Sequence, residues 1–173
     1  MNSVIFTNSL RFIGLCLLQV LVLKGMASGE GTFKYVSVIL YPVFILLLPI
    51  RIPHPLLVFL GFLIGFTVDM FYDSLGVHAS ASVFIAFIRP SVLKALEPRG
   101  GYNINESPTK FRLGFNWFFT YACILMFLHL LFYFSMEIFT PVYLGEIIMR
   151  STFSFIVSMI FVIIYQFIFN PRE

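Results

Sequence analysis

Four residues whose side chains could take part in chemistry lie inside an otherwise apolar stretch between residues 60 and 102. They are Asp69, Asp73, His78 and Arg89, and most of their neighbours are Leu, Ile, Phe or small residues. A charged side chain at the centre of a bilayer costs about 2.5–3.5 kcal/mol on insertion scales. A membrane segment keeps such groups only where they are paired, hydrated or used, so these four residues form the candidate site.

Three interpretations of this cluster stay open. In the first, Asp69, Asp73 and His78 pin a helical hairpin by hydrogen bonds, and Arg89 marks the inner interface of the membrane. In the second, the same groups line a pocket for a ligand or partner, with a lipid as one candidate occupant. In the third, the carboxylates and the imidazole act in catalysis or bind a metal. The sequence lacks Gly-x-Ser-x-Gly, His-Glu-x-x-His and Cys-x-x-Cys motifs, so we predict no enzyme, metal or cofactor.

Glycine spacing indicates how the segments carrying this cluster pack together. Gly61, Gly65 and Asp69 recur at every fourth residue, which places them on one stripe of a helix. A Gly-x-x-x-Gly pattern lets another backbone approach closely. We therefore expect the stripe to face a neighbouring helix and not lipid. On the segment that follows, His78 and Arg89 fall on a common face of an ideal helix.

Composition identifies the class of protein. Of the 173 residues, 60% are hydrophobic and only 11% are charged, and the mean hydropathy is +0.97. A soluble domain carries about 25% charged residues. Because a spanning helix takes about 20 residues, the sequence predicts an all-α, polytopic membrane helix bundle of about six transmembrane helices, forming a single domain over residues 1–173.

Six apolar segments are predicted to span the membrane. They cover residues 9–23, 35–50, 56–71, 77–96, 113–136 and 144–169. Proline occurs inside two of them, and we expect Pro42 to kink the second helix and Arg89-Pro90 to interrupt the fourth. Gln19, within the first segment, is expected to face another helix, because a lone amide in lipid is costly.

Basic residues in the loops predict the orientation. With both termini inside, the inner loops hold Arg51, Lys94, Arg99, Lys110, Arg112 and Arg172, whereas the outer loops hold Lys24, Lys34 and Arg150 balanced by Glu30, Glu137 and Glu146. Lys and Arg concentrate in short cytoplasmic loops, so both termini are predicted to be cytoplasmic. The polar loop 97–112, with Arg99, Lys110 and Arg112, is then the expected surface for a partner protein or anionic lipid; no nucleic-acid partner is expected.

The central run of the sequence resembles a known bacterial family. The resemblance is carried by Gly61-Phe62, Gly65, Asp69, Phe71, Gly76, His78-Ala79, Ala81-Ser82-Val83-Phe84, Arg89-Pro90 and Arg99-Gly100-Gly101-Tyr102, and more weakly by Leu17-Leu18-Gln19-Val20-Leu21 and by Pro42 with Phe44-Ile45-Leu46-Leu47-Leu48-Pro49. In these residues, in length and in the expected number of helices, the chain resembles the rod shape-determining MreD family over essentially its whole extent.

The resemblance implies a role in the cell-elongation machinery of rod-shaped bacteria, which controls peptidoglycan synthesis and cell shape. It implies a multi-pass protein of the inner membrane whose partners are the bitopic protein MreC, the actin-like protein MreB, the glycosyltransferase RodA and a class B penicillin-binding protein. It also implies a fold similar to the substrate-binding subunits of energy-coupling-factor transporters. The family supplies no catalytic residues to carry over.

A second class of function is a small-molecule binding subunit of a membrane transporter. The fold resemblance favours it, although fold does not settle function. Such subunits dock through small residues spaced by four on their first helix, and here Gly14 is followed by Leu18 at that spacing, which counts against this function. A third class, a membrane-embedded enzyme, lacks a recognisable nucleophile and base. We therefore expect a non-enzymatic scaffold or interaction protein.

Overall fold

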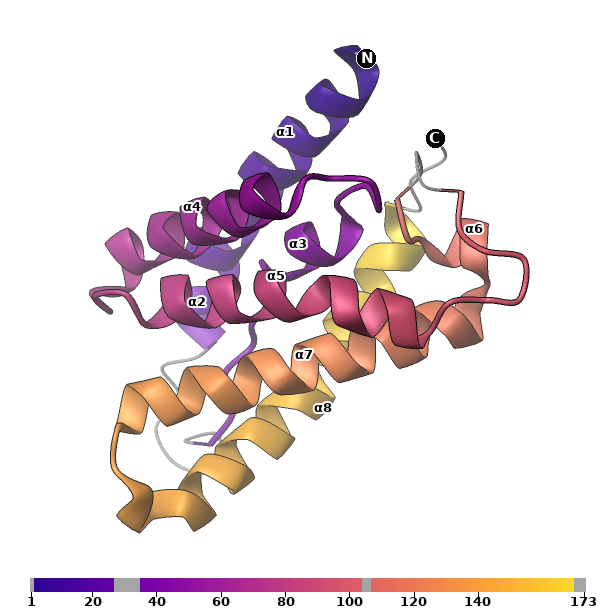
Figure 1. Ribbon diagram of the computed structural model, residues 1–173. Coiled ribbons are helices and arrows are strands. Elements are labelled where there is room, and N and C mark those ends of the chain that lie inside the picture. Colours follow the sequence, from indigo (N-terminus) through magenta and orange to yellow (C-terminus); the bar gives the residue numbers. More distant parts are fainter. Residues whose placement is uncertain (1, 27–34, 104–106, 170–173) are drawn as a thin grey trace.

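A computed structural model of the chain describes residues 2–26, 35–103 and 107–169 (Figure 1). In chain order its helical elements are α1 (Asn2–Leu17), the π-helix η1 (Leu18–Leu23), α2 (Lys24–Met26), α3 (Val43–Leu47), α4 (His54–Tyr72), α5 (Val77–Ala95), α6 (Lys110–Leu113), α7 (Phe115–Ile138), the 3₁₀ turn η3 (Pro141–Tyr143) and α8 (Leu144–Ile168). The predicted all-α class is confirmed for these residues.

Four helical stretches of the described chain are long and apolar enough to cross a membrane. They are Val4–Leu23, His54–Tyr72, Phe115–Ile138 and Leu144–Ile168. Their outer faces expose large apolar side chains such as Phe6, Phe59 and Ile160, as expected where lipid and not water is the neighbour. The multi-pass membrane character is thus supported, whereas the prediction of six spans is not confirmed.

The helices α4, α5, α7 and α8 lie side by side in that order, and each runs antiparallel to the next (Figure 1). α1 crosses behind α4 and contacts α3 and α4. One end of the bundle carries the α4–α5 turn, and we call it the hairpin end. The opposite end carries α6 and the chain on either side of it, and we call it the basic end. These two ends position the candidate site residues described below.

The predicted second spanning helix is wrong. Residues 36–40 form no regular structure, a turn follows at residues 41–42, and only α3 is helical. Pro42 does not kink a helix but forms the N-cap of α3, with φ −62°. Two prolines explain the difference, because Pro42 and Pro49 allow only about one turn of uninterrupted helix between them.

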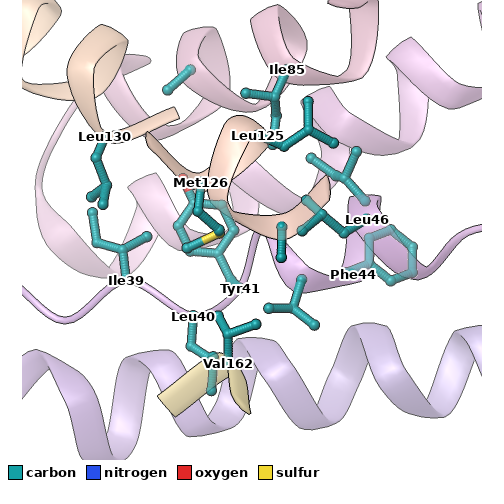
Figure 2. Packing of buried hydrophobic residues seen from close by; sticks show 14 of the residues in the cluster. Ile39, Leu40, Tyr41, Phe44, Leu46, Ile85, Leu125, Met126, Leu130 and Val162 are labelled. Atoms are coloured by element: carbon teal, nitrogen blue, oxygen red, sulfur yellow. The ribbon is translucent and has the colours of Figure 1, made fainter. Parts of the chain in front are cut away.

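The segment of residues 35–50, which is helical only in α3, runs through the centre of the protein. Residues 38–48 are all buried, and Figure 2 shows Ile39, Tyr41 and Leu46 among side chains of α5, α7 and α8 such as Met126 and Val162. Irregular backbone is tolerated at membrane depth only where protein surrounds it. The bundle supplies that surrounding, so the segment forms a core strut instead of a lipid-facing helix.

The predicted interruption of the fourth segment is also wrong, because α5 runs unbroken from Val77 to Ala95 with Pro90 inside it. Neighbouring helices on both sides hold it in place, and a proline within such a packed helix is tolerated. Other predicted boundaries agree with the structure to within a few residues: α4, α7 and α8 match the apolar runs 56–71, 113–136 and 144–169.

Candidate functional site

The carboxylate of Asp69 caps the start of the neighbouring helix. Its Oδ1 accepts hydrogen bonds from the backbone N–H of His78 (3.0 Å) and the hydroxyl of Ser74 (2.8 Å), and its Oδ2 accepts one from the N–H of Ala79 (2.8 Å). The first N–H groups of a helix have no partner within the helix, and a negative charge is favourable there. Asp69, which is buried, therefore fastens the end of α4 to the beginning of α5.

The glycine stripe of α4 packs directly against α5. A Cβ atom added at Gly65 would lie 2.5 Å from the carbonyl oxygen of His78 and 2.6 Å from the Cα of Ala79. One added at Gly61 would lie 2.9 Å from the Cβ of Ala86. These separations are too short for any side chain. The absence of a side chain at both glycines thus brings the two helices close enough for Asp69 to reach the start of α5.

Asp73 does not join the cluster. It ends α4 in the left-handed conformation with φ 54°, and its side chain is exposed at the hairpin end. The turn then needs a second positive φ, at Gly76 (φ 84°), where only glycine adopts the conformation freely. Of the two carboxylates that the sequence pointed to, the structure brings only Asp69 into contact with the His78 backbone.

His78 lies in an aromatic cage beneath this turn. Its ring centroid is 4.7 Å from that of Tyr133, 4.9 Å from Tyr72 and 5.6 Å from Tyr41. The ring is only 1% exposed, and its Nδ1 is 3.7 Å from Oδ1 of Asp69, beyond hydrogen-bond distance. Neither ring nitrogen has a hydrogen-bond partner in the described part of the chain.

Arg89 is buried and does not snorkel to an interface. Its Nε donates to the hydroxyl of Tyr121 (2.8 Å), and its Nη2 donates to the carbonyl oxygens of Leu46 (3.4 Å) and Leu48. Tyr121 in turn donates to the Leu46 carbonyl (3.1 Å). These carbonyls at the end of α3 have no helical partner, so the guanidinium caps the short helix and ties the core strut to α5 and α7.

A second set of polar side chains holds the non-helical part of the core strut. The amide of Gln19 accepts the backbone N–H of Leu40 (2.8 Å) and donates to the carbonyl of Val38 (3.0 Å). The hydroxyls of Ser154 and Ser158 on α8 accept the N–H groups of Ser37 (2.9 Å) and Ile39 (3.0 Å). The expectation that Gln19 faces another helix is confirmed, because its amide also donates to the hydroxyl of Tyr72 on α4 (2.9 Å).

Three residues of these networks, Ser154, Ser158 and Tyr121, were not predicted from the sequence. A usable signal was present: Ser151, Ser154 and Ser158 are spaced by three and four residues in an apolar helix, and that spacing places them on one face. A row of hydroxyls on a membrane helix indicates a neighbour with unsatisfied polar groups. For Ser154 and Ser158 that neighbour is the core strut, whereas Ser151 donates to the carbonyl of Leu130 on α7.

A cavity of about 250 Å³ opens at the hairpin end, and we call it the polar cavity. It is lined by Gln19, Lys24, Ser37, Val38, Ile39, Tyr72, Ser74, His78, Tyr133 and Glu137. All of these side chains except Val38 and Ile39 carry a polar group. His78 is thus the one member of the predicted cluster that reaches this cavity.

A larger cavity of about 470 Å³ lies toward the basic end and is lined by Arg89, His54, Lys94, Glu97 and Tyr102 together with apolar residues. Tyr102 donates its hydroxyl to the carbonyl of Leu93 (2.7 Å). Desolvation by burial raises the pKa of Tyr102 to about 12. It therefore remains a neutral donor at physiological pH and holds the loop after α5 against that helix.

The basic loop residues fall at the basic end but not in one cluster. Arg99 and Arg112 are exposed, whereas the Nζ of Lys110 sits 3.2 Å from the ring centre of Phe167 near the end of α8. That contact is a cation–π interaction and joins α6 to α8. Glu30, Lys34 and Arg172, which the charge count also used, lie outside the described residues.

The chemistry of these groups is that of a hydrogen-bonded scaffold. Asp69, Arg89 and Gln19 serve backbone groups of the same chain, and among the described residues no group of three or more His, Cys, Asp and Glu side chains is placed to hold a metal ion. Comparison with known proteins found no matching family model, curated protein or solved structure.

Proposed function

We propose that the chain is a multi-pass component of the bacterial cell-elongation machinery, related to the MreD family, which acts in the cytoplasmic membrane by protein contacts and without catalysis. The sequence resemblance described above motivates the proposal. The observation that carries it is the engagement of the buried charges: Asp69 and Arg89 both bind backbone groups of this chain. Groups used in this way build a rigid body whose outer surface is left for partners.

The two ends of the bundle differ in charge, which supports a cytoplasmic basic end. Arg51, Lys94, Arg99, Lys110 and Arg112 lie at the basic end with Glu97, whereas Asp73, Glu137 and Glu146 lie at the hairpin end with Lys24 and Arg150. Arg150 pairs with Glu146 at 2.8 Å, which reduces its weight as a topology signal. Basic residues favour the cytoplasmic side, where exposed Arg99 and Lys94 meet partner proteins or anionic headgroups.

Complementation tests this function. The chain is expressed in rod-shaped cells depleted of their own MreD-family protein, and cell shape is followed together with membrane abundance. Restored rod shape, and co-purification of a bitopic MreC-like protein in mild detergent, are the expected results. Round cells despite normal abundance of the chain, with no such partner recovered, would reject the role in elongation.

A small-molecule binding subunit of a transporter is the second candidate, and the polar cavity favours it. A polar cavity at one end of an apolar bundle suits a small solute. The discriminating observation is the partner: co-purification with an ATPase-driven transport module, in place of elongation proteins, would favour this function over the first.

A further inference from the structure

Part of the lining of the polar cavity, the side chains of His78, Tyr133 and Glu137, is used by neither the hairpin contacts of Asp69 nor the core strut. Hydroxyl, carboxylate, ammonium and imidazole groups converge there, in a chain of which 60% is hydrophobic. Polar groups at the end of a membrane bundle are expensive unless water or a ligand satisfies them. The cavity is therefore a candidate binding site that adjoins the contacts of Asp69 through Ser74.

His78 supplies the strongest indication of a ligand. Its ring lines the cavity, is 1% exposed, and has two ring nitrogens without hydrogen-bond partners in the described chain. A neutral imidazole offers one donor and one acceptor, and buried polar atoms are seldom left unpaired. The aromatic cage of Tyr41, Tyr72 and Tyr133 fixes the ring, so a bound molecule must come to it.

Two opposite charges line the same cavity. Lys24 donates to the carbonyl of Phe71, and its Nζ lies 5.5 Å from the ring centre of Tyr72. An ammonium group carries three donors, so Lys24 can serve several acceptors at once. The carboxylate of Glu137 is 40% exposed and lies 3.9 Å from the guanidinium of Arg150. The cavity thus offers a positive and a negative group to one occupant.

We propose that the polar cavity binds a small zwitterion that carries a primary ammonium group and a phosphate or carboxylate group. The anionic group of the ligand pairs with Lys24, and its ammonium group pairs with Glu137. His78 hydrogen-bonds to the portion of the ligand that joins these two groups. The cavity volume of about 250 Å³ is smaller than the roughly 300–1,000 Å³ typical of pockets for drug-sized ligands. An ethanolamine phosphate headgroup of a membrane lipid and a free small zwitterion share this chemistry.

A primary ammonium group fits the lining better than a quaternary one. It has three N–H donors, and the carboxylate of Glu137, the hydroxyl of Tyr133 and a nitrogen of His78 are acceptors in the cavity. A trimethylated group would leave these acceptors unsatisfied, which is unfavourable. Choline compounds are therefore the matched negative probes. The proposed site does not depend on the role in cell elongation.

The binding experiment uses the purified full-length chain in lipid nanodiscs. In the first arm, nanodiscs contain phosphatidylcholine with or without phosphatidylethanolamine, and native mass spectrometry measures which lipid the protein retains. In the second arm, the nanodiscs contain phosphatidylcholine alone, and calorimetry measures binding of phosphoethanolamine and of phosphocholine. Retention in the first arm identifies a lipid headgroup, and binding in the second identifies a soluble zwitterion; either result supports the site.

Three variants and one control locate the binding. His78→Phe keeps the aromatic packing and the backbone bond to Asp69 but removes both ring nitrogens, while Glu137→Gln and Lys24→Met each remove a charge. Each is expected to weaken binding about tenfold, as the loss of a charge-assisted hydrogen bond does. Asp73→Asn, which alters an exposed acid at the same end outside the cavity lining, should leave binding unchanged.

Several outcomes would overturn the proposal. Equal retention of both lipids with no binding of phosphoethanolamine means that the cavity holds only water. Binding that persists unchanged in Glu137→Gln and Lys24→Met means that the ligand sits elsewhere. Circular dichroism and gel filtration check the fold of every variant, and if His78→Phe does not fold, the partly exposed Glu137 and Lys24 decide the matter.

Discussion

The carboxylate of Asp69, on α4, accepts the backbone N–H of Ala79, on α5, at 2.8 Å. A side chain from one helix thereby takes the place that an N-cap residue normally fills in its own helix. The contact exists only because Gly65 lets the two backbones meet one turn earlier in α4. The close approach of α4 to α5 at Gly65 and the capping of α5 by Asp69 thus depend on each other, and each can be tested by its own substitution.

Asp69→Ala is expected to reduce the amount of folded protein in the membrane. The substitution removes the acceptor for the buried N–H groups of His78 and Ala79, and each unsatisfied group costs about 1–3 kcal/mol. Membrane abundance and rescue of rod shape are measured together. Asp73→Asn is the control, because it lies at an exposed position four residues later and asparagine tolerates the left-handed backbone conformation there. Full abundance of Asp69→Ala with complete loss of rod shape would show that Asp69 acts in function and not in folding.

Gly65→Leu is expected to destabilise the protein by about 1–3 kcal/mol or more, as overpacking does. Its Cβ would meet backbone atoms of His78 and Ala79, which cannot move aside as a flexible side chain can. Thermal unfolding in detergent measures the effect. Gly14→Leu is the matched control, because nothing lies within 4 Å of a Cβ at that position. Equal melting temperatures for the two variants would contradict the packing of α4 against α5.

Arg89→Lys is expected to fail as a substitute for Arg89. The guanidinium uses two separate nitrogens to reach Tyr121 and the carbonyls of Leu46 and Leu48, and a single ammonium group on a flexible stem does not reproduce that fork. The loss is about 1–3 kcal/mol in unfolding free energy. Lys94→Ala, exposed on the same helix, should be near neutral. A wild-type melting temperature for Arg89→Lys would indicate that Arg89 needs only its charge.

The sequence predicts correctly those helices whose placement in the membrane follows from their own apolar composition. The apolar runs gave α4, α7 and α8 because a long stretch without charges has few other structures available in lipid. The Gly61–Gly65–Asp69 spacing gave a stripe, since helical periodicity is a local property. In both cases the information lies within about 20 consecutive residues.

The core strut could not be predicted in this way. Residues 35–50 are as apolar as a spanning helix, but their backbone groups pair with Gln19 on η1 and with Ser154 and Ser158 on α8, the two serines lying more than one hundred residues away along the chain. The role of Arg89 follows from that structure, because the carbonyls of Leu46 and Leu48 lack a helical hydrogen-bond partner only where α3 ends. Because residues 35–50 were predicted to be a spanning helix, the carbonyls that bind Arg89 could not be predicted, although the sequence pointed to Arg89 itself.

Ser158→Ala is expected to loosen the core strut locally. It removes the acceptor for the N–H of Ile39, and a buried unsatisfied donor costs about 1–3 kcal/mol. Hydrogen–deuterium exchange of the peptide containing residues 36–41 should therefore accelerate. Thr152→Ala on the same helix is the control, because Thr152 is exposed and bonds only within α8 to the carbonyl of Ile148. Unchanged exchange in Ser158→Ala would mean that the serines do not hold the strut.

The orientation of the chain is predicted from the charge difference between its two ends. Leu75, fully exposed in the α4–α5 turn, should face outward, and Gly100, exposed beyond α5 at the basic end, should face the cytoplasm. Single cysteines at these positions, in a background where Cys16 and Cys123 are replaced by Ala, are treated with a membrane-impermeant maleimide. Because basic loops are retained on the cytoplasmic side, Leu75→Cys should react in intact cells, and Gly100→Cys only after the cells are opened. The reverse pattern would invert the topology and place the polar cavity at the cytoplasmic face.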